Sequence, residues 1–151
     1  MKRILVLLCL GVLTLPMAGR AFSFTDTEGK RQQLAAYHGK WVLVNFWATW
    51  CPPCLAEIPD LVALFNAHRD RDLVVIGVAM EDQYPERVAR FVKELKISYP
   101  VVLGNSKLAA QVGSIEGLPQ TYLYNPKGKL VAQRVGPVTR QSIEAYIGAK
   151  P

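Results

Sequence analysis

The clearest signal in this chain is the stretch Trp41-Val-Leu-Val-Asn-Phe-Trp-Ala-Thr-Trp-Cys-Pro-Pro-Cys54. Residues 41–47 are largely apolar and rich in aromatic and β-branched side chains, which is typical of a strand buried on both faces. Residues 55–68 carry apolar side chains at helical spacing. The two cysteines therefore lie where a buried strand is followed by a helix. At a helix N-terminus, unpaired N–H groups and the helix dipole favour a thiolate, so redox chemistry is the first hypothesis.

Strands and helices alternate through the rest of the chain. A hairpin is expected over residues 22–34, and a second buried strand over residues 72–79. Another hairpin is expected over residues 120–135, around the turn Asn125-Pro-Lys-Gly128. Further helices are expected over residues 85–95, 105–112 and 139–147, and a short extended segment over residues 99–103.

This order of elements predicts one α/β domain with a mixed central sheet and helices on both faces. Helical crossovers make the central strands parallel, whereas the last hairpin adds antiparallel ones. The chain has 151 residues, half of them apolar and a fifth charged, which suits a single globular domain. No internal repeat or low-complexity segment interrupts it.

Residues 1–21 are predicted to form a secretory signal peptide. Lys2-Arg3 precedes an apolar run from Ile4 to Leu15, and Gly19 and Ala21 would occupy the −3 and −1 positions of a cleavage site. We therefore expect export to the periplasm or cell envelope and a mature domain over residues 22–151. An uncleaved N-terminal anchor is the alternative, although the apolar run falls short of the roughly 20 residues that a spanning helix needs.

Charge and cysteine content exclude several functions. Removal of Lys2, Arg3 and Arg20 leaves 15 basic and 12 acidic residues, and their interspersed pattern gives no support for nucleic-acid binding. Removal of the signal peptide also removes Cys9, so Cys51 and Cys54 are the only cysteines of the expected mature domain. A disulfide that closes so short a loop stabilises a fold by only about 2 kcal/mol, so the pair is expected to react. A zinc site would need further ligands, and the sequence has no second cysteine pair and no histidine cluster. No cofactor is expected beyond a redox-active Cys51–Cys54 disulfide.

Four segments together resemble one family. The resemblance is to the thioredoxin fold and, more narrowly, to the TlpA/ResA-type thiol–disulfide oxidoreductases, relatives of the cytochrome-c-maturation thioredoxins of bacterial envelopes. It covers nearly the whole mature chain, with an N-terminal β-hairpin and an inserted segment near Glu81–Leu103 that ordinary thioredoxins lack. The segments that carry it are Val42–Cys54, Glu57-Ile-Pro59, Gly117-Leu-Pro-Gln-Thr-Tyr122 and Asn125-Pro-Lys-Gly-Lys129.

The expected exchange uses both cysteines. Cys51 is the candidate nucleophile, since the thiolate carries exchange, and Cys54 would resolve the mixed disulfide from one helical turn inside. Pro52 and Pro53 suit a first helical turn and would also stiffen the loop.

Other site residues follow from the resemblance. It implies that Pro119 is a cis-proline beside the cysteines and that the backbone of Leu118 pairs with substrate; a strand-initiating turn proline is the simpler alternative. It also implies that Glu57 is an acid that tunes the thiols or exchanges a proton with Cys54, whereas sequence alone favours compensation of the helix dipole. Thioredoxins carry a buried acid at the position of Asn45, and this chain departs from them there.

The remaining aromatic and polar residues near the motif are given simpler roles. Trp50 is expected on the substrate-facing surface and Trp47 in the core. Thr49 is expected in a loop. His38 and His68 are expected at ordinary solvated positions.

The leading functional hypothesis is an exported reductase of protein disulfides, with apocytochrome c as one possible substrate. The resemblance implies a membrane thiol electron donor of the CcdA/DsbD type. A disulfide-forming oxidase or isomerase would use the same residues, and a thioredoxin-like binding module would dock extended segments beside Pro119 without catalysis. A peroxidase is disfavoured because the Trp-Cys-x-x-Cys motif differs from a lone peroxidatic cysteine. Natural substrate, direction of electron flow and oligomeric state do not follow from the sequence.

Overall fold

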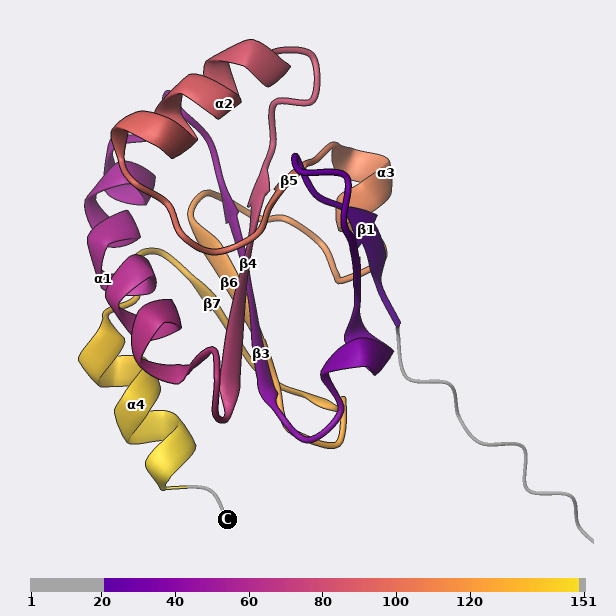
Figure 1. The fold of residues 1–151 in the computed structure, drawn as a ribbon, viewed down its shortest axis with the longest axis vertical. Helices are drawn as coiled ribbons and strands as arrows, with labels where there is room; N and C mark the ends of the chain where they lie inside the picture. Colours follow the sequence, from indigo (N-terminus) through magenta and orange to yellow (C-terminus); the bar gives the residue numbers. More distant parts are fainter. Residues whose placement is uncertain (1–20, 150–151) are drawn as a thin grey trace, which may run out of the picture.

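A five-stranded mixed sheet forms the centre of the computed structural model, which describes residues 21–149 (Figure 1). The predicted signal peptide lies outside the described residues, apart from Ala21. The strand order is β5-β4-β3-β6-β7. The strands are β3 (Trp41–Trp47), β4 (Leu73–Ala79), β5 (Val101–Leu103), β6 (Gln120–Tyr124) and β7 (Leu130–Val135).

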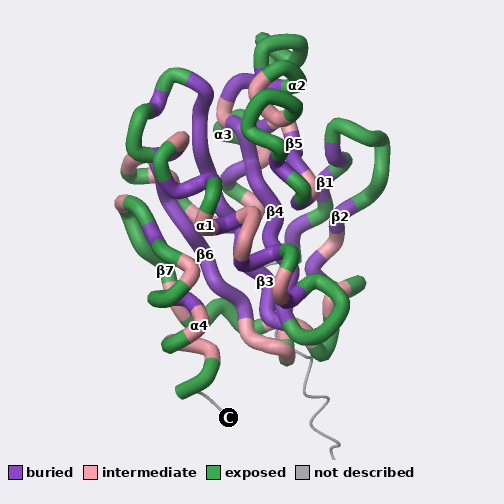
Figure 2. Tube along the Cα trace, turned by 60° about the vertical axis from the view of Figure 1, so that its left-hand side comes forward, coloured by how far each residue is buried: buried purple, intermediate pink, exposed green. Residues whose placement is uncertain are grey.

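The pairing confirms the predicted mixed sheet. β3 pairs in parallel with β4, and β4 with β5, as helical crossovers require. β6 runs antiparallel to both β3 and β7. Every residue of β3, β4 and β6 is buried, whereas the edge strand β7 is largely exposed (Figure 2).

Helices and the N-terminal hairpin cover the two faces of the sheet. Figure 1 shows α1 and α4 on one side, and α3 with the β1–β2 hairpin on the other. The helices are α1 (Pro52–His68), α2 (Pro85–Glu94), α3 (Ser106–Ala109) and α4 (Arg140–Gly148). Asn105 caps α3, and Thr139 with Ser142 forms a capping box at α4. Among the described residues, no helix is long and apolar enough to cross a lipid bilayer.

The hairpin predicted over residues 22–34 consists of β1 (Ser23–Thr25) and β2 (Arg31–Gln33), paired antiparallel. The expected connector after it contains a short 3-10 helix, η1 (Leu34–Tyr37). Phe22 and Phe24 stack with ring centroids 4.7 Å apart, and Phe22 meets Tyr124 of β6 edge-to-face. These contacts attach the hairpin to the sheet on the side away from α1 (Figure 1).

Candidate active site

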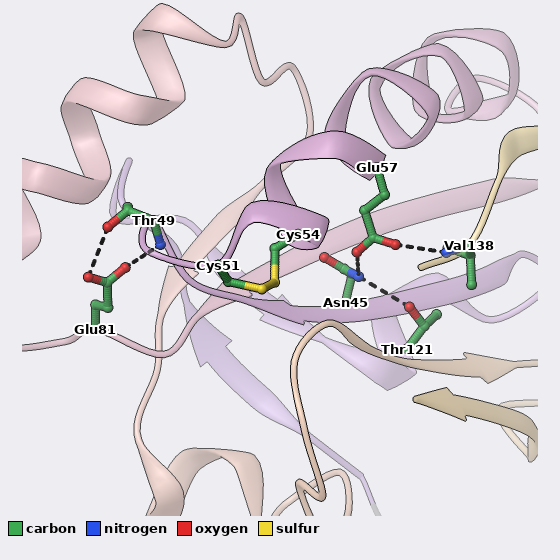
Figure 3. Close-up of a disulfide and its surroundings, with 8 residues drawn as sticks. All are labelled: Asn45, Thr49, Cys51, Cys54, Glu57, Glu81, Thr121 and Val138. Atoms are coloured by element: carbon green, nitrogen blue, oxygen red, sulfur yellow. Dashed lines mark hydrogen bonds between the residues drawn. A yellow bond between two sulfur atoms is a disulfide. The ribbon is translucent and has the colours of Figure 1, made fainter. Parts of the chain in front are cut away.

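Cys51 and Cys54 form a disulfide at the start of α1, with their Cα atoms 5.3 Å apart (Figure 3). Cys51 is the N-cap residue, and Cys54 lies in the first turn. Cys54 is 0% exposed, whereas Cys51 retains 4% of its surface. Both cysteines are therefore buried, but Cys51 keeps a small exposed area next to the exposed Trp50, whereas Cys54 keeps none.

Pro52 and Pro53 occupy the first two helical positions and contribute no N–H groups. Cys54 is thus the first residue of α1 with a backbone donor. A reduced Cys51 has fewer backbone donors nearby than its position at a helix N-terminus implies. The stabilisation of a Cys51 thiolate by the helix start therefore depends more on the helix dipole and less on direct N–H contacts.

Glu57 is buried one turn further along α1. Its Oε1 accepts a hydrogen bond from Asn45 Nδ2 at 2.7 Å, and its Oε2 accepts one from the N–H of Val138 at 2.9 Å. Burial raises the pKa of Glu57, and the hydrogen bonds from Val138 and Asn45 offset part of that effect. An inward-facing acid with two donors differs from the solvated, dipole-compensating residue that sequence alone favoured.

Asn45 supplies a feature of the site that sequence reasoning missed. Its Nδ2 also donates to Thr121 Oγ1 of β6 at 3.1 Å, so one side chain connects β3, β6 and α1. Its Oδ1 is buried without a hydrogen-bond partner within residues 21–149, and Figure 3 shows this oxygen on the side of the disulfide. A single polar residue in the apolar run of residues 41–47 was the available signal.

The Leu118–Pro119 peptide bond is cis, as the family resemblance implied. In the antiparallel register Gln120 lies opposite Phe46, so Pro119 lies at the end of β3 from which the cysteine loop departs. The carbonyl of Pro119 accepts a hydrogen bond from Gly136 N–H at 2.9 Å. The backbone of Leu118, by contrast, has no hydrogen-bond partner in the described part of the chain.

Trp47 is fully buried in the core, as expected, and Trp50 is 65% exposed beside Cys51. Thr49 belongs to the loop, as expected, but it is buried, and both its N–H and its hydroxyl donate to the carboxylate of Glu81. The sequence pattern contained no signal for this contact, which joins residues 32 positions apart.

The expectation for His68 was wrong. His68 is buried at the C-terminal end of α1, with Nδ1 2.7 Å from Asp72 and Nε2 3.1 Å from Glu144 of α4. It therefore joins α1 to α4 at the end of α1 away from the disulfide. His38 is exposed, as predicted. Among residues 21–149, no group of three or more His, Cys, Asp or Glu side chains could hold a metal ion.

A thioredoxin fold with a Cys-x-x-Cys disulfide at the first helix defines a dithiol redox protein. A model of the AhpC/TSA family matches residues 18–133. The thiol-disulfide oxidoreductase ResA of Bacillus cereus is 32% identical over 126 residues, which covers 83% of this chain and 72% of the relative. The ResA of Halalkalibacterium halodurans is 33% identical over 127 residues, with 83% and 71% covered.

Solved structures agree with these relatives. A thiol:disulfide interchange protein of Chlorobium tepidum superposes with a TM-score of 0.78 at 30% identity, covering 87% of this chain and 93% of that one. StoA from Bacillus subtilis gives a TM-score of 0.72 at 25% identity, with 84% and 96% covered. The chain belongs to the AhpC/TSA family and to the ResA-like thiol–disulfide oxidoreductases. It is accordingly an enzyme that exchanges thiols and disulfides.

Proposed function

We propose that this enzyme reduces disulfides of exported proteins in the bacterial cell envelope, with apocytochrome c as a candidate substrate. The observation that carries the proposal is the asymmetry of the cysteine pair, in which Cys54 is 0% exposed and Cys51 keeps 4% of its surface beside exposed Trp50. A reductase needs one thiol that meets the substrate and a second that is shielded until the mixed disulfide has formed.

The reaction transfers two electrons from the enzyme dithiol to the substrate disulfide. The Cys51 thiolate attacks one substrate sulfur, forms a mixed disulfide and expels the other substrate sulfur as a thiolate. Cys54, after losing its proton, attacks Cys51 Sγ and releases the second substrate sulfur. The substrate leaves as a dithiol, and the enzyme leaves with the Cys51–Cys54 disulfide. A thiol electron donor then reduces this disulfide by the same exchange in reverse.

Glu57 is the proposed acceptor of the Cys54 proton. It lies three residues after Cys54 on α1, is buried, and has a pKa raised by that burial. A carboxylate with a raised pKa is a stronger base than an exposed one, which suits it to take a proton from a thiol. Asn45 holds its Oε1 and so fixes the orientation of the carboxyl group.

Leu118, Pro119 and Trp50 are the proposed substrate contacts. The unpaired backbone of Leu118 offers an N–H and a carbonyl to an extended substrate segment. Pro119 follows Leu118 and lies next to the end of β3. Trp50 exposes a large apolar surface on the cysteine loop. Pro52 and Pro53 are exposed at the same helix start and complete the surface that a substrate would meet.

Export to the periplasm rests on the signal-peptide pattern of residues 1–21. Oxidising compartments keep thiols as disulfides, so a reductase there needs electrons delivered across the membrane. We therefore propose a membrane thiol donor of the CcdA/DsbD type. An oxidase would use the same residues with electrons flowing the opposite way.

The test is a trapping experiment in the native envelope. Cys54→Ser cannot resolve a mixed disulfide, so it should retain substrates covalently on Cys51, and Cys51→Ser is the matched control. Envelope proteins with cysteine pairs, captured by Cys54→Ser alone, support the proposal. Equal capture by both variants, or none, contradicts it. A reduction potential near the roughly −270 mV of thioredoxin supports a reductase, and one near about −120 mV overturns that direction.

A further inference from the structure

The loop before Cys51 is held by a buried carboxylate from another part of the chain. Glu81 Oε2 accepts the N–H of Thr49 at 2.5 Å, and Glu81 Oε1 accepts the Thr49 hydroxyl at 3.0 Å. Glu81 is only 3% exposed. Hydrogen bonds to a charged acceptor in a buried setting are stronger than neutral ones, so this pair of bonds is a firm attachment.

Glu81 begins the segment that, as the family resemblance implies, is inserted relative to ordinary thioredoxins. It follows β4 and precedes α2, and its backbone carbonyl accepts the N–H of Tyr84 at 3.0 Å. Arg87 Nη1 on α2 lies 3.6 Å from Glu81 Oε1, and the Arg87 guanidinium lies 4.4 Å from the ring centroid of Tyr84. The inserted segment therefore supplies both the acceptor that holds Thr49 and the cation nearest to that acceptor.

The loop itself has few other attachments. Cys51 N–H donates to the Ala48 carbonyl within the loop at 3.2 Å, the Cys51 carbonyl accepts the N–H of Leu55 in α1 at 3.1 Å, and no side chain caps α1. Trp50 is exposed, and Pro52 and Pro53 lack the donors that usually order a helix start. In the oxidised protein the Sγ–Sγ bond also fixes Cys51 to α1. In the reduced protein that bond is gone, and the bonds from Thr49 to Glu81 and from Leu55 N–H to the Cys51 carbonyl remain to hold the loop.

We propose that Glu81 is a positioning residue, which holds Thr49 so that the reduced Cys51 stays within bonding reach of Cys54. The inference rests on the proposed exchange at these two cysteines. A held loop keeps the effective concentration of one thiol near the other high, which favours the disulfide. Without the restraint the dithiol gains conformational freedom, so the protein disulfide becomes easier to reduce.

The test is the glutathione equilibrium of the mature protein, in which the protein disulfide and two glutathione thiols give the protein dithiol and glutathione disulfide. Glu81→Ala should favour the dithiol about tenfold, which corresponds to a potential about 30 mV less negative. Thr49→Val keeps the N–H donor and should shift the equilibrium less. Thr49→Ser keeps both donors and should match the wild type.

Asp26→Ala is the matched control for a purely structural role. Asp26 is also buried, and it accepts three hydrogen bonds, from the N–H groups of Glu28 and Lys30 and from Gln32 Nε2, but in the hairpin turn. The Asp26→Ala substitution should lower the free energy of unfolding and leave the glutathione equilibrium within twofold of the wild type.

The outcomes separate the inference from the proposed function. A shift in Glu81→Ala without one in Asp26→Ala supports positioning, whereas equal shifts or no shift overturn it. If Glu81→Ala does not fold, a difference between Thr49→Val and Thr49→Ser decides in the same way. A wild-type protein that does not exchange with glutathione would overturn the proposed function, and the inference with it.

Discussion

The side-chain amide of Asn45 on β3 donates a hydrogen bond to the carboxylate of Glu57 on α1, with 2.7 Å between Nδ2 and Oε1. Two elements thus each contribute a buried polar group beside the disulfide (Figure 3). In thioredoxins, as the family resemblance implies, the acid occupies the strand. Here the strand carries the amide and the helix carries the acid, so Asn45 fixes the acid instead of titrating.

Glu57 makes the stability of the protein depend on pH. Burial raises its pKa in the folded state above the ordinary value of 4.5, so the folded protein binds a proton more tightly than the unfolded chain. The stabilising contribution of Glu57 to the free energy of unfolding is therefore fully present below pH 4.5. It is lost as the pH rises through the raised pKa of Glu57 in the folded protein. Relative to Glu57→Gln, the wild type should lose stability over that window. Urea unfolding of both proteins from pH 4 to pH 8 measures this trend.

The dependence on pH separates the titration of the Glu57 carboxyl group from other effects of the Glu57→Gln substitution. A glutamine also places one amide donor against Asn45 or Val138, but the cost of that mismatch does not vary with pH. Glu28→Gln, at an exposed turn, is the control and should track the wild type at every pH. A constant difference between wild type and Glu57→Gln would contradict a raised pKa.

Asn45→Asp should destabilise the fold. It replaces the donor to Glu57 with a second buried carboxyl group and removes the donor to Thr121. Loss of a buried hydrogen bond to a charged group predicts a cost of at least about 2 kcal/mol at pH 7. The cost should shrink in acid, where one carboxyl is protonated and donates to the other. Thermal or urea unfolding at the two pH values checks both statements.

Asn125→Asp is the matched control for Asn45→Asp. Asn125 uses its side-chain oxygen to accept the N–H groups of Lys127 and Lys129 in an exposed turn, and an aspartate accepts them equally well. Its free energy of unfolding should stay within about 0.5 kcal/mol of the wild type. Equal costs at the two positions would show that the Asn45–Glu57 bond has no special role.

Substitutions of Trp47 and Trp50 should have different effects, the first on the stability of the fold and the second on substrate binding. Trp47→Ala removes a fully buried ring and should cost about 3–5 kcal/mol. Trp50→Ala removes a ring that is 65% exposed and should change the free energy of unfolding by no more than about 0.5 kcal/mol. Trp50→Ala should instead raise the KM for a protein disulfide substrate. An unchanged KM would remove Trp50 from the substrate surface.

Local patterns predicted most of the fold. The apolar run of residues 41–47, the helical spacing after it and the turn at residues 125–128 correspond to β3, α1 and the β6–β7 turn. The cis bond before Pro119 came from the family resemblance, since proline alone rarely adopts it.

The contacts that were missed join distant parts of the chain. The Thr49–Glu81 bonds span 32 residues, and the His68–Glu144 contact spans 76. A histidine or an acid in a polar stretch looks solvated until the fold places a partner beside it. Asn45 was noted as a departure from thioredoxins, but its partner Glu57 became visible only when α1 was packed on β3.

The order in which the two thiols react with a small alkylating reagent shows which of them can meet a substrate. Fully reduced protein is treated with limiting iodoacetamide at pH 7, and the modified cysteine is identified by mass spectrometry. Because Cys51 keeps 4% of its surface beside exposed Trp50 and Cys54 is 0% exposed, the label should appear on Cys51 well before Cys54. Modification of Cys54 first, or of neither thiol, would contradict the assignment of Cys51 as the nucleophile.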